Sequence, residues 1–298
     1  MTRADAAGRL PSRIAFLGFG LIGGSIAAAV RSAGGRGSRM VAWTPAGVGP
    51  AEGVRRGFLD EAASSAAVAL DAAELVVLAG PPLAIVATLA EASASLRAAA
   101  AAGATITDVG STKRRIIDSA AAEGLPFVGG HPMAGRETTG AASATADLFV
   151  DRPWVIVPGG DARALDVERV EALARATGAL PVRLGPDEHD AAVGAISHLP
   201  LVVAAALVES VAERGRDWSL ARSLAATGWS DMTRLANGDP EMGAGILSTN
   251  APAVLARLRA MRDALDGWIE RLERDAADPE LRGRLESVRR SLLDETRE

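Results

Sequence analysis

Short apolar runs alternate with Ala-rich helical segments over the first 185 residues. Runs such as 14–17 (IAFL) and 75–78 (LVVL) have the length and composition of buried strands, whereas 22–32 and 113–122 have the composition of helices. Strands that alternate with helices favour parallel pairing through right-handed crossovers. The fold class expected is therefore α/β, a Rossmann-type doubly wound parallel sheet. Further strands are expected at 40–43, 105–107, 154–157 and 180–183, and helices from 52, over 83–101 and over 166–176.

The pattern changes after Gly185 and Pro186. From there to the end we expect no strand, only segments of helical period such as 191–213, 219–227 and 252–274. Residues 202–207, VVAAAL, are apolar on every face of a helix and are expected to be buried, against the fold or against another subunit. The chain thus divides into a dinucleotide-binding Rossmann domain at 1–185 and an all-α domain at 186–298.

Composition narrows the class of protein. The net charge of −5 is spread without a basic stripe, so nucleic acid is not an expected partner. The absence of cysteine excludes disulfides, thiolate metal sites and cysteine nucleophiles. The polar N-terminus lacks the apolar core of a signal peptide, and no apolar run reaches the roughly 18 residues of a membrane span. A cytoplasmic protein with no membrane partner and no metal is the expectation.

A glycine-rich loop follows the first expected strand directly. It has the pattern G-x-G-x-x-G, in which the glycines permit a tight turn, close approach of a pyrophosphate and close packing of the next helix. The strand–loop–helix context favours dinucleotide binding over a purely structural turn. The residues assigned to the cofactor are Gly18, Phe19, Gly20, Leu21, Ile22 and Gly23, together with Gly80 and Pro81 after the strand at 75–78.

The acidic residue that usually holds the ribose 2′-hydroxyl is missing from the end of the second strand. Thr44 stands there, Asp60 and Glu61 lie beyond the next helix, and no arginine adjoins Thr44 to grip a 2′-phosphate. Thr44 is assigned to the cofactor site, and the choice between NAD and NADP stays open.

Two further motifs belong at the carboxyl edge of the sheet, where ligands bind in open α/β folds. DVGSTK, which contains Ser111, follows the strand at 105–107, and GGHPMAG, which contains His131, comes one helix later. Glycines allow close approach to a ligand, and proline stiffens the loop that aims the imidazole. The alternatives are a hydrogen-bonded loop histidine and, for Ser111, a helix N-cap before Lys113.

Taken together, the motifs resemble the prephenate/arogenate dehydrogenase family of tyrosine biosynthesis. The resemblance is carried by GFGLIGGS from Gly18, DVGSTK, GGHPMAG, EHD at 188–190 with ISHLP at 196–200, and GWSDMTR at 228–234 with DPEM at 239–242. It implies an NAD(P)-dependent oxidoreductase that oxidatively decarboxylates prephenate to 4-hydroxyphenylpyruvate or arogenate to tyrosine. It also implies a homodimer formed through the helical domain.

The resemblance also implies roles for individual residues. His131 is the expected catalytic residue: it hydrogen-bonds the ring hydroxyl and takes its proton as hydride leaves for the nicotinamide. Ser111 is expected to orient the same hydroxyl. Arg234 is the expected carboxylate ligand, and His198 and Ser197 are expected near the substrate.

Other interpretations of these residues stay open. Arg234 could be a helix-surface arginine, and His198 a buried histidine bonded to a backbone carbonyl. Asp190 could support His198, cap a helix or touch substrate. His189 is expected to be solvated.

Departures from the family pattern bear on the substrate. Leu201 stands where many relatives that use prephenate have a second histidine, and Ser230 stands where some have a basic residue. Both changes remove polar or cationic groups and favour arogenate, which is less negative than prephenate, or an enzyme that accepts both.

Two other functions compete with this one. A β-hydroxyacid-type dehydrogenase would need a lysine on the second domain, but the single lysine, Lys113, lies in the first. A non-catalytic dinucleotide sensor explains the glycine loop and leaves Ser111, His131 and Arg234 unexplained.

Overall fold

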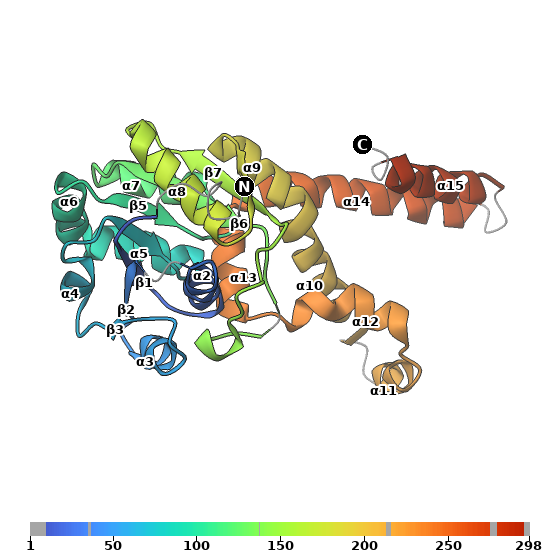
Figure 1. Ribbon diagram of the computed structural model, residues 1–298. Coiled ribbons are helices and arrows are strands. Elements are labelled where there is room, and N and C mark those ends of the chain that lie inside the picture. Colours follow the sequence, from blue (N-terminus) through green and yellow to red (C-terminus); the bar gives the residue numbers. More distant parts are fainter. Residues whose placement is uncertain (1–9, 35–36, 137, 213–215, 275–278, 295–298) are drawn as a thin grey trace. The chain divides into compact units, whose positions relative to one another are not determined.

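A computed structural model describes residues 10–34, 37–136, 138–212, 216–274 and 279–294. Within these residues eight strands form one sheet in the order β3-β2-β1-β4-β5-β6-β7-β8 (Figure 1). The strands are β1 Arg13–Leu17, β2 Arg39–Trp43, β3 Glu61–Ala62, β4 Leu75–Leu78, β5 Thr105–Asp108, β6 Phe127–Pro132, β7 Pro153–Pro158 and β8 Leu180–Arg183.

The expected α/β doubly wound architecture is confirmed, with one departure from parallel pairing. β1 lies between β2 and β4, so the chain order reverses at β1, and the crevice beyond the carboxyl ends of β1 and β4 is where such sheets bind ligands. β6 and β7 are antiparallel, with His131 opposite Val155. This pair departs from the expected parallel pairing because the described residues of the link between β6 and β7 hold the 3-10 turn Ala141–Ser143 and no crossover helix.

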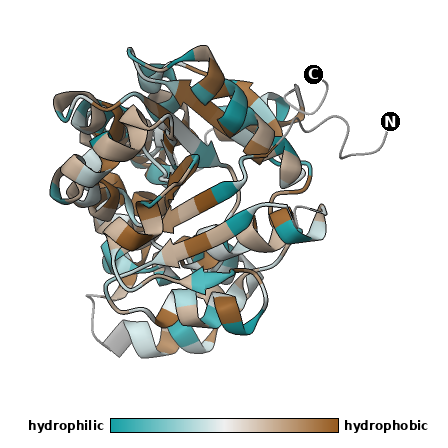
Figure 2. Cartoon of the chain, turned by 60° about the vertical axis from the view of Figure 1, so that its left-hand side comes forward, coloured by the Kyte–Doolittle hydropathy of each residue, from teal (hydrophilic) through white to brown (hydrophobic). Residues whose placement is uncertain are grey.

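Helices cover both faces of the sheet, and each face has its own apolar core. On one face α2 (Leu21–Ser32) and α8 (Ala164–Ala176) pack over β1, β4 and β7. On the other face lie α4 (Ala66–Leu70), α5 (Pro82–Glu91), α6 (Ser93–Ala101) and α7 (Arg114–Ala122). The strands between them carry apolar side chains, brown in Figure 2, as sheets buried on both sides do.

Two helices differ from the expected ones. The expected helix at 83–101 is two helices, α5 and α6, bent by 75°. Ala92, between them, is a good helix former, so nothing local marks the break; both Leu89 and Leu96 are buried in the same core, and packing bends the chain. The helix expected from residue 52 begins earlier, as α3 (Val48–Arg55).

After β8 the described chain is helical. The helices are α9 (Pro186–Val193), the π-helical turn η2 (Gly194–His198), α10 (Leu199–Ala212), α11 (Arg216–Ser223), α12 (Thr227–Thr233), the 3-10 turn η3 (Arg234–Asn237), α13 (Pro240–Thr249), α14 (Ala251–Arg274) and α15 (Pro279–Asp294). By compactness the chain separates into Met1–Ala251 and Pro252–Glu298. The helices up to α13 thus belong to the same compact unit as the sheet.

One helical stretch of the described chain, Pro186–Ala212, has the length and apolar character of a membrane span, and the bent pair α5 and α6 does so only if counted as one span. The apolar window of Pro186–Ala212 is 22% buried. Its first turns carry His189 and Asp190, whose side chains are buried among polar partners of the same unit. The first turns of this helix therefore lie among buried polar groups.

Candidate active site

His131 lies in a strand. β6 continues through the glycines of GGHPMAG to Pro132, so the expectation of a loop at His131 was wrong. The two glycines are used for close approach inside the sheet: a Cβ at Gly129 would lie 2.9 Å from Cδ of Lys113, and one at Gly130 would lie 2.6 Å from the carbonyl oxygen of Asp108. β6 pairs with β7 through His131 and with β5 at Phe127 and Val128, so this strand holds the imidazole more rigidly than a loop would.

A buried ion pair joins the first and last residues of DVGSTK beside this strand. Asp108, the last residue of β5, and Lys113 are both fully buried, and Nζ of Lys113 donates to the Asp108 carboxylate. The same carboxylate accepts hydrogen bonds from the backbone N–H groups of Gly110 (2.8 Å) and Gly130 (3.1 Å). Burial raises the pKa of Asp108 and lowers the pKa of Lys113, and in each case the partner's charge opposes the shift. The ion pair therefore holds the two ends of the motif around Ser111 together, and the hydrogen bond from Gly130 ties that motif to the strand of His131.

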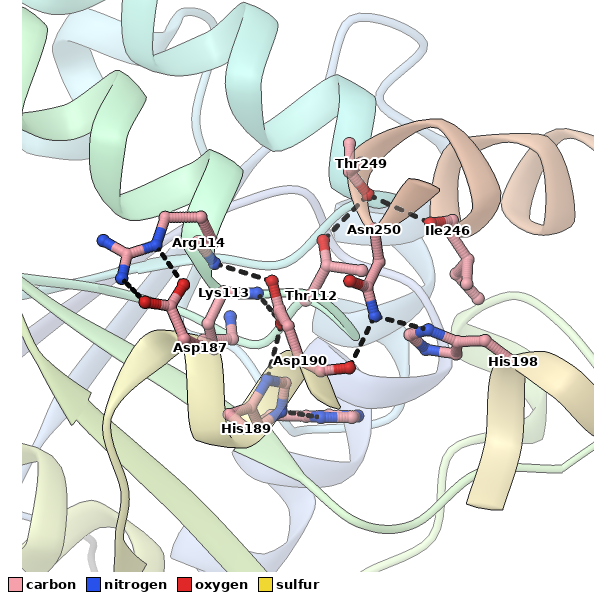
Figure 3. Close-up of polar contacts among 12 residues, drawn as sticks. Thr112, Lys113, Arg114, Asp187, His189, Asp190, His198, Ile246, Thr249 and Asn250 are labelled. Carbon is pink, nitrogen blue, oxygen red and sulfur yellow. Dashed lines mark hydrogen bonds and ion pairs between the residues drawn. The ribbon is translucent and has the colours of Figure 1, made fainter. Parts of the chain in front are cut away.

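His189 is in contact with His131, so the expectation that His189 is solvated was wrong. Nδ1 of His131 lies 2.8 Å from Nε2 of His189, and the ring centroids are 5.1 Å apart. Nδ1 of His189 lies 2.8 Å from Oδ1 of Asp190. The side chains of His189 and Asp190 come from the middle of α9 and are buried (Figure 3). The EHD motif thus contributes two groups behind His131.

Asp190 caps a helix other than its own. Its Oδ1 accepts from the backbone N–H of Lys113 at 2.7 Å, and its Oδ2 accepts from that of Arg114 at 2.9 Å (Figure 3). These amides begin α7, where unpaired N–H groups and the helix dipole favour a carboxylate. Ser111 is therefore not the cap of α7 and faces the cavity described below.

His198 is buried on the far side of Asp190. Nδ2 of Asn250 donates both to Nδ1 of His198, at 3.1 Å, and to the backbone carbonyl of Asp190, at 2.8 Å (Figure 3). His198 is thus bonded to a side-chain amide instead of the backbone carbonyl considered above. Burial lowers the pKa of His198 to about 4, so the ring is neutral at physiological pH.

A cavity of about 440 Å³ opens in front of His131 and Ser111. One wall comes from the glycine-rich loop and the β4–α5 turn, and the other from the segment after β6 and the start of α13. Its lining residues are Gly20, Leu21, Ile22, Ala79, Gly80, Pro81, Pro82, Val109, Gly110, Ser111, His131, Pro132, Ala134, Gly135, Arg136, Thr138, Thr139, Gly140, Gly238, Asp239, Glu241 and Met242.

The glycine loop has the shape that a dinucleotide requires. Gly18 has φ +93°, and a Cβ there would meet the carbonyl oxygen of Ala79 at 2.5 Å. Gly20, at the N-terminus of α2, has open space where a Cβ would stand and lines the cavity, so a phosphate can approach the helix amides. The side chain of Phe19 is buried against Phe16, so only the backbone of Phe19 can contact a cofactor.

Other predicted site residues lie apart from this cavity. Ser197 and Arg234 are exposed, and neither they nor His198 line it. Thr44, at the end of β2, accepts a hydrogen bond from the backbone N–H of Gly47 and is outside the lining. Among the described residues no group of three or more His, Cys, Asp or Glu could hold a metal ion.

Two residues of the site, Arg136 and Asn250, were not predicted from the sequence. Arg136 directly follows GGHPMAG and lines the cavity, and adjacency to that motif was the available signal. Asn250 carried no local signal, because only the packing of α13 brings it to Asp190 and His198.

Family models match almost the whole of this architecture. A model described as the nucleotide-binding domain of prephenate dehydrogenase matches residues 28–182, and one described as its dimerization domain matches 185–287. The chain belongs to the prephenate dehydrogenase family. It is an NAD(P)-dependent oxidoreductase, and the resemblance drawn from its motifs is confirmed.

Individual relatives agree with the family model. A prephenate dehydrogenase of Bacillus subtilis (strain 168) is 33% identical over 89% of this chain and 70% of its own length. The structure of Synechocystis arogenate dehydrogenase is 31% identical, with a TM-score of 0.78 over 95% of this chain and 99% of its own. The structure of prephenate dehydrogenase from A. aeolicus in complex with hydroxyphenyl propionate and NAD+ is 26% identical, with a TM-score of 0.85 over 96% of this chain and 99% of its own.

Proposed function

We propose that the cavity binds a nicotinamide dinucleotide and a cyclohexadienyl substrate side by side, and that the enzyme oxidatively decarboxylates prephenate or arogenate there. One observation supports this proposal: His131 and Ser111 line the same cavity as the glycine loop. A hydroxyl-bearing ring in this space would lie between the proposed base and the nicotinamide. Neither a β-hydroxyacid dehydrogenase nor a dinucleotide sensor accounts for His131 and Ser111 on that wall.

The chain's own residues supply the proton transfer. The bound nicotinamide would accept the hydride from the carbon that bears the ring hydroxyl. His131, neutral because burial holds its pKa well below the usual range, accepts the hydroxyl proton, and Ser111 orients that hydroxyl. The ring carboxylate leaves as carbon dioxide, and its bonding electrons pass through the ring to the new carbonyl oxygen, which gives an aromatic phenolate. Protonated His131 returns its proton to that oxygen, so the product is a phenol and the base is restored.

The charges on the cavity wall favour arogenate over prephenate. Arg136 is the one cationic side chain among the described lining residues, and Asp239 and Glu241 are acidic. Asp239 is committed to capping α13, where it accepts from the N–H of Met242, which leaves Glu241 to face the ligand. Arogenate carries an ammonium group where prephenate carries a keto oxygen, so it pairs with Glu241 while a carboxylate pairs with Arg136.

The end of the cofactor site near Thr44 lacks a charged group that would distinguish NAD from NADP. No carboxylate stands between Arg39 and Ala51, so a 2′-phosphate near Thr44 meets no repulsion. We expect both NAD and NADP to be used.

The family's dimerization domain supports a homodimer through the helical region. Most apolar residues of α10 are only partly buried in the single chain, and burial against a second copy would remove them from water. A cytoplasmic enzyme is the corresponding expectation for compartment.

The substrate-binding roles of Arg234, His198 and Ser197 stay predictions. None of the three lines the cavity of one chain. Titration of each alanine variant with the substrate found to be active would test them.

Initial rates in a two-by-two design test this function. Prephenate or arogenate is combined with NAD or NADP, and formation of reduced cofactor is followed by absorbance. We expect turnover with arogenate to exceed turnover with prephenate, with either cofactor.

The matched variant is Glu241→Gln, which keeps size and removes the negative charge. It should raise KM for arogenate by about 5- to 150-fold, the range of an ion pair worth 1–3 kcal/mol, and change KM for prephenate little. Equal use of both substrates before and after the change would remove Glu241 from specificity. If folded protein that binds dinucleotide shows no turnover in any of the four combinations, the proposed dehydrogenase activity is contradicted.

The pH dependence follows from the lowered pKa of His131. A base must be neutral to accept a proton, and a lowered pKa keeps the imidazole neutral into more acid solution. We therefore expect kcat/KM to stay level through about pH 6.5, the ordinary histidine pKa, and to fall only below it. A profile that already declines between pH 8 and 6.5 would mean that His131 is not held neutral by burial.

A further inference from the structure

We infer that His189, held by Asp190, is a positioning residue that fixes which ring nitrogen of His131 carries the proton. The inference rests on the proposed role of His131 as proton acceptor and adds to it the reason why the acceptor nitrogen faces the substrate. The hydrogen bonds that fix this proton run from Asp190 to His189 and from His189 to His131.

Asp190 is fixed as a hydrogen-bond acceptor. The backbone N–H groups of Lys113 and Arg114 both donate to its carboxylate at the start of α7. A carboxylate whose two oxygens both receive amide N–H groups acts as an acceptor toward further partners as well. Nδ1 of His189, 2.8 Å from Oδ1, must therefore carry a hydrogen and donate it.

The tautomer of His131 follows from that of His189. A neutral imidazole with hydrogen on Nδ1 has a bare Nε2, and this atom lies 2.8 Å from Nδ1 of His131. Nδ1 of His131 must donate to it, so the unprotonated nitrogen of His131 is Nε2. His131 lines the cavity, and Nε2 has no protein partner among the hydrogen bonds of the described residues. The ring therefore presents a proton acceptor to the ligand.

The arrangement is rigid. His189 is 0% exposed and Asp190 5% exposed, so water cannot substitute for either partner. The two rings meet edge to face, with 70° between their planes. His189 and Asp190 are consecutive residues of α9, and Asp190 is anchored to α7, so neither ring can turn without breaking a buried hydrogen bond.

The same chain of groups stabilises the product of proton transfer. When His131 takes a proton on Nε2, its Nδ1–H continues to donate to His189, and the Asp190 charge stands one ring away. The other charged or titratable groups around His131 are Lys113, whose charge is matched by Asp108, and His198. Asp190 is thus the negative group left to balance the imidazolium.

Two substitutions separate positioning from packing. His189→Phe keeps an aromatic ring but cannot accept from His131, so its tautomer becomes free; kcat should fall about 100-fold or more while KM changes little. In His189→Gln the amide oxygen can accept from His131 while the NH₂ donates to Asp190, and kcat should stay within about 10-fold of wild type. Thermal melting and dinucleotide affinity, measured on both, show whether each variant is folded.

A direct measurement of tautomers does not depend on substrate. With three histidines in the chain, ¹⁵N NMR of histidine-labelled enzyme gives six ring nitrogens, assigned with His131→Asn and His189→Gln. We expect hydrogen on Nδ1 of both His131 and His189, and loss of the single tautomer of His131 in His189→Phe. Hydrogen on Nε2 of His131 in the wild type, or full kcat in folded His189→Phe, would overturn the inference. If the wild type turns over no substrate while the NMR tautomers are as expected, the proposed function fails and the hydrogen-bond assignment stands.

Discussion

His131→Asn is expected to lower kcat by orders of magnitude while leaving dinucleotide binding intact. Asparagine can place its side-chain NH₂ near the position of Nδ1, so it still donates to Nε2 of His189, 2.8 Å from the native nitrogen. It has no group at the position of Nε2, the atom inferred above to accept the substrate's proton. The variant therefore removes the proton acceptor and keeps the buried hydrogen bond behind it.

The size of the effect follows from general-base catalysis, which contributes roughly 10²- to 10⁴-fold. We expect kcat to fall by that factor with the better of the two substrates, and the dissociation constant of NAD or NADP, measured by calorimetry, to change little. Turnover within about 10-fold of wild type would place the proton acceptor elsewhere. A parallel loss of dinucleotide affinity would show instead that His131 supports the shape of the cavity.

The sequence was informative about the sheet because its signals are local. Apolar runs such as those of β1 and β4 are bounded by polar residues and glycines, and the glycine loop after β1 marks the ligand edge without reference to the rest of the chain. Local sequence patterns did not predict features that depend on tertiary packing. The bend at Ala92 and the antiparallel pairing of β7 depend on what each segment packs against.

The same distinction between local patterns and tertiary packing applies to the site. His131 and Ser111 were found because glycine-containing motifs surround them. His189 was missed because a histidine in a polar helical turn, EHD, has the local pattern of a solvated face; its burial comes from the contact between α9 and β6. Asp190 was considered as a cap, yet the helix it caps begins 76 residues earlier in the chain, which no local pattern reveals.

Lys113→Met is expected to be the most destabilising single change at this site. It removes the cation from a pair whose side chains are both fully buried and leaves the Asp108 carboxylate with two backbone N–H donors. Removing one partner of a buried ion pair costs about 3–5 kcal/mol, because the remaining charge is uncompensated. Urea denaturation should show a loss of this size in the free energy of unfolding.

Two control variants separate charge from packing. Arg97→Met breaks the exposed pair with Glu123, 3.2 Å apart, and should cost no more than about 1 kcal/mol. Adding Asp108→Asn to Lys113→Met removes the stranded charge while keeping an acceptor for the N–H of Gly110 or Gly130, so the double variant should be more stable than Lys113→Met alone. If the double variant were no more stable, the loss would come from the packing of the lysine stem against Gly129, and the ion pair would have no part in holding the two ends of the motif around Ser111 together.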